Sequence, residues 1–119
     1  MLEKILGTKT AAYIMLYLFH YGEVYARELS LDLGISLSAI QNALFKYEES
    51  GVILSKKMGN VRIFRFNQKN PLTKPLMKLV EVVHDSMTIE DKEKFFHSRK
   101  RPRRIGKPVL NGSKVSFKD

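Results

Sequence analysis

The stretch Tyr25–Phe66 reads YARELSLDLGISLSAIQNALFKYEESGVILSKKMGNVRIFRF, and the order of its patterns decides the fold. Its first apolar residues recur at helical spacing up to Gly34, a residue that tolerates the positive φ of a helix end. A second helical pattern begins at Ser36, whose hydroxyl can accept from the first turn as an N-cap, and it ends at Gly51. Two β-rich runs follow. The stretch therefore predicts helix, tight turn, helix and hairpin in that order.

The two β-rich runs, 52–57 and 61–66, are separated by Met58-Gly59-Asn60. Gly and Asn tolerate the positive φ that a tight hairpin requires. A hairpin that directly follows two helices joined by a tight turn predicts an α+β winged helix-turn-helix. In this fold a three-helix core carries the hairpin as its wing, and we expect C-terminal helices and a basic tail beyond it.

Residues 37–50 divide into two faces on a helical wheel of about 100° per residue. Ile40 and Leu44 lead an apolar face that we expect to pack on the protein. The opposite face has uncharged hydrogen-bonding side chains in its first half, and both glutamates lie in the last turn. A helix that enters a DNA major groove by its N-terminal half needs this division, because Asn and Gln pair with adenine and carboxylates repel phosphate. The predicted base-reading residues are Ser38, Gln41, Asn42 and Phe45, the last through a thymine methyl group.

Basic and capping side chains around this helix predict contacts with the phosphate backbone. Cations near the tip of a hairpin suit a wing that lies along phosphates, and a helix N-terminus attracts anions. The predicted backbone-contacting residues are Arg27, Ser36, Lys46, Lys56, Lys57 and Arg62. An ordinary amphipathic helix with a solvated polar face, followed by a solvated hairpin, shows the same patterns, so both interpretations stay open at this stage.

The segment from Tyr25 to Asn67 resembles the winged-helix domain of ArsR-like prokaryotic transcriptional regulators. The similarity lies in AREL, the turn GIS, the SAIQNAL pattern, the SGVI that starts the hairpin, and GNVRIFRFN in the wing. The resemblance implies transcription regulation through DNA. Metal-sensing members carry a cysteine in the stretch corresponding to VYARELSLDLG, which contains none here. The resemblance therefore does not extend to metal sensing at that site.

Further helices are predicted on both sides of this stretch. Residues 8–21 are apolar around much of a helix, which implies burial on more than one side. Helical spacing resumes at Pro75, and Thr88 is a cap for a last helix. Residues 23–25 predict a short third strand beside the wing. These surplus apolar faces either form a homodimer surface or only complete a small core.

The positive charge is unevenly distributed along the chain. The 119 residues carry a net charge of +9, yet residues 1–97 hold 13 Lys and Arg against 11 Asp and Glu. Residues 98–119 hold 8 against 1. We therefore assign 1–97 to one winged helix-turn-helix domain with flanking dimerisation helices, and 98–119 to a basic tail expected to be disordered in the free protein. The tail residues predicted to contact phosphate are Arg99, Lys100, Arg101, Arg103 and Arg104.

Enzyme, metal and membrane patterns are not found in the sequence. The chain has no cysteine, and the histidines His20, His84 and His97 are scattered, without a helical pair at i, i+4 beside Asp85. We therefore expect no metal, no cofactor and no catalytic site. The longest apolar run, Ala11–Phe19, is far shorter than the ~20 residues that cross a membrane. We expect no membrane partner and a cytoplasmic location.

These observations together predict a sequence-specific regulator of transcription that binds double-stranded DNA as a homodimer. Two alternatives belong to other classes of function. One is a winged-helix interaction module that serves as an accessory subunit of a separately encoded enzyme. The other is RNA binding through the basic tail.

Overall fold

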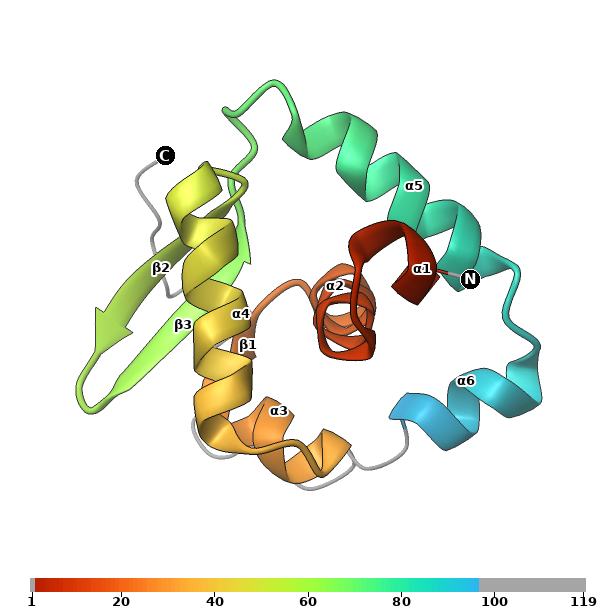
Figure 1. Ribbon diagram of the computed structural model, residues 1–119, viewed down its shortest axis with the longest axis horizontal. Coiled ribbons are helices and arrows are strands. Elements are labelled where there is room, and N and C mark those ends of the chain that lie inside the picture. The colour runs from red at the N-terminus through yellow and green to blue at the C-terminus, as the bar shows by residue number, and fades with distance from the viewer. Residues whose placement is uncertain (1, 97–119) are drawn as a thin grey trace.

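Residues 2–96, which the computed structural model describes, form helices around a small antiparallel sheet (Figure 1). In chain order the elements are α1 (Leu2–Leu6), α2 (Lys9–Tyr21), β1 (Val24–Tyr25), α3 (Ala26–Leu33), α4 (Leu37–Ser50), β2 (Ile53–Met58), β3 (Val61–Phe66), α5 (Thr73–Asp85) and α6 (Ile89–Phe96). The order α3, α4, β2 and β3 confirms the predicted winged helix-turn-helix. The β2–β3 hairpin is its wing.

The turn between α3 and α4 is built by local hydrogen bonds. Gly34 ends α3 with φ 68°, in the left-handed region that glycine adopts without steric penalty. Ser30 Oγ donates to the carbonyl of Ile35 at 2.6 Å and holds the turn. The Ser36 hydroxyl then accepts from the backbone N–H of Ala39 at 3.3 Å, so it caps α4 as predicted.

The sheet has the strand order β1-β3-β2, with β3 in the middle. Val24 pairs with Phe64, which confirms the third strand predicted beside the wing. In the hairpin Met58 pairs with Val61, so the turn is the dipeptide Gly59-Asn60 and not the predicted tripeptide. Gly59 has φ 64°, and two-residue turns with positive φ match the twist of the paired strands.

Helix α2 lies at the centre of the other helices, with α1, α4, α5 and α6 around it (Figure 1). Ile14, Met15, Tyr17 and Leu18 have no exposed surface. Helix α1, which the sequence did not predict, contributes Leu2 to this core. The apolar surplus of 8–21 is therefore buried within the chain. The prediction that this helix provides a homodimer surface is not supported, because the described helices already cover it.

Hydrogen bonds from α2 hold α6 in place. Tyr17 donates its hydroxyl to the carbonyl of Phe95 at 2.8 Å, and Tyr21 donates to that of Phe96 at 3.0 Å. Thr88 caps α6, because its hydroxyl accepts from the backbone N–H of Asp91 at 3.0 Å. The predicted cap is thus confirmed.

Helix α5 begins at Thr73, two residues before the predicted start at Pro75. Proline is accepted there because the N–H groups of a first helical turn have no intrahelical partner. No helix between residues 2 and 96 has the length and apolar character needed to cross a membrane.

Candidate nucleic-acid interface

The outward face of α4 carries the residues predicted to read bases. Ile40 and Leu44 are fully buried and define the opposite, inward face. At about 100° per residue, Asn42 lies almost directly opposite them and is exposed. Ser38 and Phe45 flank it and are also exposed. These three side chains therefore form one continuous outward surface on the helix.

Gln41 occupies the margin of this surface. It is half-buried, and the wheel places it on the side of α4 that carries Glu48 and faces the wing. Phe45 approaches the wing as well, since its ring centroid lies 6.3 Å from that of Phe64. The aromatic ring is nevertheless 47% exposed, so part of it remains accessible on the outward surface of the helix.

The structure separates the three basic residues predicted for the wing. Side chains alternate between the two faces of a strand, so the adjacent Lys56 and Lys57 point to opposite sides. Lys57 pairs with Arg62, and their face is the one that packs on α4 through Phe64. Lys56 pairs with Ile63 on the other face. The α4-facing side of the wing therefore holds two of the three cations.

One hydrogen-bonded network joins α4 to both strands of the wing. Ser55 Oγ donates to Glu48 Oε2 at 2.7 Å, and Arg62 Nη1 donates to the same Ser55 Oγ at 2.9 Å. We call this arrangement the Glu48–Ser55–Arg62 network. Sequence reasoning treated Glu48 only as a carboxylate kept away from phosphate, and it gave Ser55 no role. No local pattern reveals the network, because strand register brings its members together.

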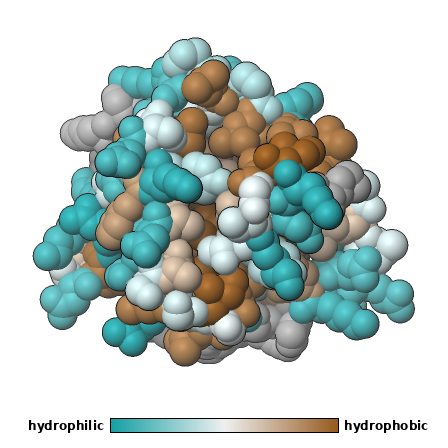
Figure 2. Space-filling view, in the orientation of Figure 1, coloured by the Kyte–Doolittle hydropathy of each residue, from teal (hydrophilic) through white to brown (hydrophobic). Residues whose placement is uncertain are grey.

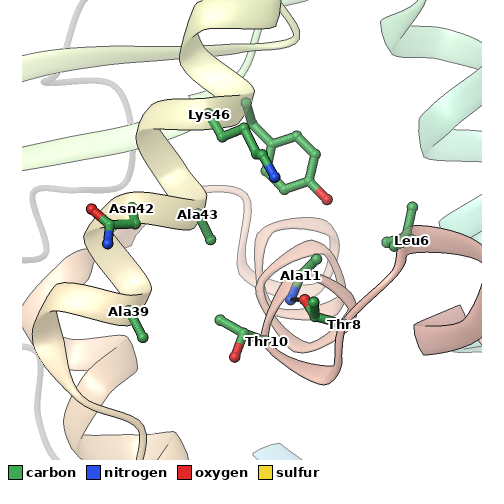
Figure 3. Close-up of a pocket in the computed structure, with 9 residues that line it drawn as sticks. Leu6, Thr8, Thr10, Ala11, Ala39, Asn42, Ala43 and Lys46 are labelled. Carbon is green, nitrogen blue, oxygen red and sulfur yellow. Dashed lines mark hydrogen bonds between the residues drawn. The ribbon is translucent and has the colours of Figure 1, made fainter.

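A groove of about 310 Å³ separates α4 from the start of α2 (Figure 3). Small side chains make this space, and Figure 3 shows Ala39 and Ala43 of α4 pointing across it toward Thr10 and Ala11. The groove is lined by Leu6, Thr8, Thr10, Ala11, Ala39, Asn42, Ala43, Lys46 and Tyr47. Asn42 thus borders both the outward face and the groove.

Lys46 and Tyr47 lie at the rim of the groove near the C-terminal half of α4. Lys46 is exposed and is separated from the wing by the width of the helix. Burial raises the pKa of the Tyr47 hydroxyl above its ordinary value, so the phenol is neutral at physiological pH. The rim of the groove therefore presents one cation and one neutral hydroxyl.

The remaining predicted backbone contacts lie in α3 and in the turn that precedes α4. Arg27 in the first turn of α3 and Ser36 before α4 are both exposed. The predicted tail contacts Arg99, Lys100, Arg101, Arg103 and Arg104 lie outside the described residues.

Two histidines that the sequence left scattered come together in the structure. His20 Nδ1 of α2 lies 2.9 Å from His84 Nε2 of α5, and His84 Nδ1 lies 3.1 Å from Asp85 Oδ1. The His20 ring also stacks on Phe96 at a centroid distance of 3.8 Å. Within residues 2–96 no three His, Cys, Asp or Glu side chains gather in a way that would hold a metal ion. The pair joins α2 to α5, on elements distinct from α4 and the wing.

Comparisons with known proteins give structural likeness only. No protein-family model matches the sequence, and no curated protein matches it. A structure of a ZitR variant from Lactococcus lactis matches with a TM-score of 0.53 and 23% identity, over 76% of this chain and 61% of that one. The adhesin competence repressor AdcR from Streptococcus pyogenes matches with a TM-score of 0.55 and 20% identity, over 76% of this chain and 66% of that one.

A further ZitR structure, described as that of a zinc-responsive MarR family member, matches with a TM-score of 0.48 and 21% identity, over 82% of this chain and 76% of that one. The chain spans less than two thirds of the length of the first two proteins. At these identities the likeness to ZitR and AdcR shows the fold alone, a winged helix-turn-helix.

Proposed function

We propose that this protein is a transcription regulator that binds double-stranded DNA in a sequence-specific manner. The observation that carries the proposal is the joint surface of α4 and the wing, which we call the DNA-binding face. On α4 it consists of the outward residues Ser38, Asn42 and Phe45, and on the wing of Lys57 and Arg62. Neutral hydrogen-bonding groups stand at its centre and cations at its edge.

This distribution suits the chemistry of duplex DNA. Amide and hydroxyl side chains on a helix can read base edges in the major groove, where each base pair has its own pattern of donors and acceptors. Cations at the margin contact phosphate and fix the register of the protein on the duplex. An apolar group such as Phe45 contacts the methyl of thymine. The exposed ring of Phe45 would make this contact with a thymine methyl group.

The family subtype, the cellular location and the oligomeric state are also proposals. The ArsR-like subtype is supported by the residue pattern of Tyr25–Asn67, whereas ZitR, one of the proteins of similar structure, is a zinc-responsive MarR family member. We propose a cytoplasmic location because the proposed partner is chromosomal DNA. Homodimerisation is supported by exposed large apolar residues outside the DNA-binding face, and Figure 2 shows apolar side chains gathered over α1 and α5. The exposed large apolar residues in or next to α1, α5 and α6 are Ile5, Leu72, Val82 and Ile89.

Selection of bound fragments from random duplex DNA tests the proposed function directly. We expect an enriched sequence motif and a gel shift that weakens steeply with salt, as counterion release requires. Absence of enrichment together with absence of any gel shift would leave the accessory-module alternative. Stronger competition by structured RNA than by duplex DNA would favour the RNA-binding alternative.

A further inference from the structure

The Glu48–Ser55–Arg62 network joins side chains from three consecutive elements at the edge of the DNA-binding face. Glu48 belongs to the last turns of α4, Ser55 to β2 and Arg62 to β3. The two bonds of 2.7 and 2.9 Å meet at one hydroxyl oxygen, which is donor toward the carboxylate and acceptor from the guanidinium. The geometry points to Ser55 as a positioning residue that sets where the wing presents Arg62.

This inference rests on the proposed function, because its purpose is to place a cation against phosphate. An exposed arginine normally samples many rotamers, and ordering such a side chain on binding is unfavourable. The bond from Nη1 to Ser55 orders the Arg62 side chain before DNA arrives. A guanidinium has five N–H donors, so the single bond leaves most of them for phosphate oxygens.

The network also explains why a carboxylate is tolerated beside the wing. A free Glu48 carboxylate at this position would repel phosphate and compete with it for Arg62. The Ser55 O–H occupies one carboxylate oxygen and lies between the two charged groups, so Arg62 reaches the hydroxyl and retains donors on its outer side. Glu49, the next residue, is exposed and provides a natural comparison.

Ser55→Ala in the full chain removes both hydrogen bonds at once and tests the inference. We expect affinity for the selected duplex and for unrelated duplexes to fall together by about 3- to 10-fold, the range expected when one long side chain must be ordered on binding. The slope of log K against log salt should stay the same, because the guanidinium can still reach phosphate, whereas Arg62→Ala should flatten it by about 0.9, the contribution of one phosphate contact. Ser55→Thr keeps the hydroxyl in a residue that suits a strand, and it should restore the affinity.

A double-mutant cycle with Arg62→Ala separates positioning from a general structural role. If Ser55 acts through Arg62, then Ser55→Ala should cause no further loss of affinity in the Arg62→Ala background. Ser50→Ala is the matched control, since the Ser50 hydroxyl donates only to the carbonyl of Tyr47 in the same helix, and it should bind like the wild type. Additive losses from the two changes would overturn the inference.

A second pair of variants tests the carboxylate. Glu48→Gln should weaken binding, because the amide supports the Ser55–Arg62 arrangement less strongly than the carboxylate does. Glu49→Gln removes the same charge one residue later and should leave affinity unchanged or raise it. Equal effects of the two changes would show that only net charge matters and would contradict a role for the network.

A measurement without DNA distinguishes failure of this inference from failure of the proposed function. The Arg62 side-chain N–H resonance in the free protein should be slowly exchanging, and Ser55→Ala should make it exchange rapidly. If the wild-type protein binds no duplex but shows this dependence, DNA binding is wrong and the positioning of Arg62 stands. If Ser55→Ala leaves the resonance unchanged, the inference is wrong whatever the protein binds.

Discussion

Among single residues, Asn42 is the one whose side chain is best placed to read a base. It is exposed, lies opposite the buried Ile40 and Leu44, and stands in the first half of α4. We expect Asn42→Ala to weaken specific binding by about 1–3 kcal/mol and to relax preference at one or two base positions. Competition gel shifts with single-base variants of the selected site measure both effects.

Gln41→Ala should also relax base preference, with a smaller loss of affinity. Gln41 is half-buried at the margin of α4, so fewer of its donors and acceptors reach the groove. Gln68→Ala serves as the control, because Gln68 is exposed beyond the wing and should leave binding unchanged. Retention of full affinity and of the original site preference by both α4 variants would show that α4 does not read bases.

The partly buried Tyr47 hydroxyl should make the free energy of unfolding depend on pH in the alkaline range. Its raised pKa means that the unfolded chain releases the phenolic proton at a lower pH than the folded chain. The free energy of unfolding should therefore be unaffected by this group below about pH 10 and fall as the pH rises through its folded pKa. Tyr47→Phe lacks the effect. Urea unfolding at pH 7 and pH 11 should show that wild type loses more stability than Tyr47→Phe; equal losses would count against the burial of this hydroxyl.

The residues whose positions were predicted correctly from the sequence are those that depend on local structure. The two faces of α4 follow from a helical period of 3.6, which is a local property, so Ile40 and Asn42 could be assigned without a structure. Ser55 and His84 could not, because their partners are 7 and 64 residues away and depend on strand register and helix packing. Long-range polar contacts leave no periodic signal.

Among the elements, α6 depends on α2 for its place in the fold. Phe96 is only 6% exposed, and its ring contacts Tyr17, Tyr21 and His20. We expect Phe96→Ala to lower the free energy of unfolding by about 3–5 kcal/mol, as for other buried aromatic residues. Ile89→Ala in the same helix is the control, since Ile89 is 78% exposed and should change stability by no more than about 0.5 kcal/mol. Chemical denaturation measures both, and equal effects would contradict the docking of α6.

Element boundaries were predictable where a cap or a breaker marks them. Ser36 and Thr88 each accept from a backbone N–H three residues ahead, as their positions in the sequence predicted. Helix α1 was missed because five residues are too few for periodicity to appear. Met58 belongs to β2 and not to the turn, because a two-residue turn fits the twist of the hairpin better than the predicted three-residue turn.

At the scale of the molecule, the proposed homodimer has to use surface that the monomer leaves exposed. Helix α2 is covered, whereas Val82 on α5 is 62% exposed. We expect Val82→Lys to raise the dimer dissociation constant, because a charge placed in an apolar contact must be desolvated. Sedimentation equilibrium over a concentration series measures this, with Leu31→Lys as control, since Leu31 is 66% exposed but belongs to α3.

The dimer should recognise two half-sites about one helical turn apart, ~10 bp centre to centre. The spacing can be read from the motif enriched by selection. A wild-type protein that stays monomeric with and without duplex DNA would contradict the dimer, and a motif with a single half-site would contradict the spacing.

The basic tail gives the last prediction, which concerns the chain as a whole. Residues 98–119 lie outside the described residues, and their sequence includes SRKRPRRIGK, with six basic residues in ten. Each phosphate that such a segment neutralises releases condensed counterion, and Arg can also enter a narrow minor groove. Deletion of 98–119 should therefore lower affinity for all duplexes alike and flatten the slope of log K against log salt by a few units, while base preference stays the same. Binding assays from low to moderate salt with the full and shortened chains measure this, and circular dichroism checks that the shortened chain folds. We propose that α4 reads the bases and that the tail contacts only the backbone. A shortened chain that folds but selects a different motif would contradict that proposal. An unchanged salt slope would show that the tail takes no part in binding.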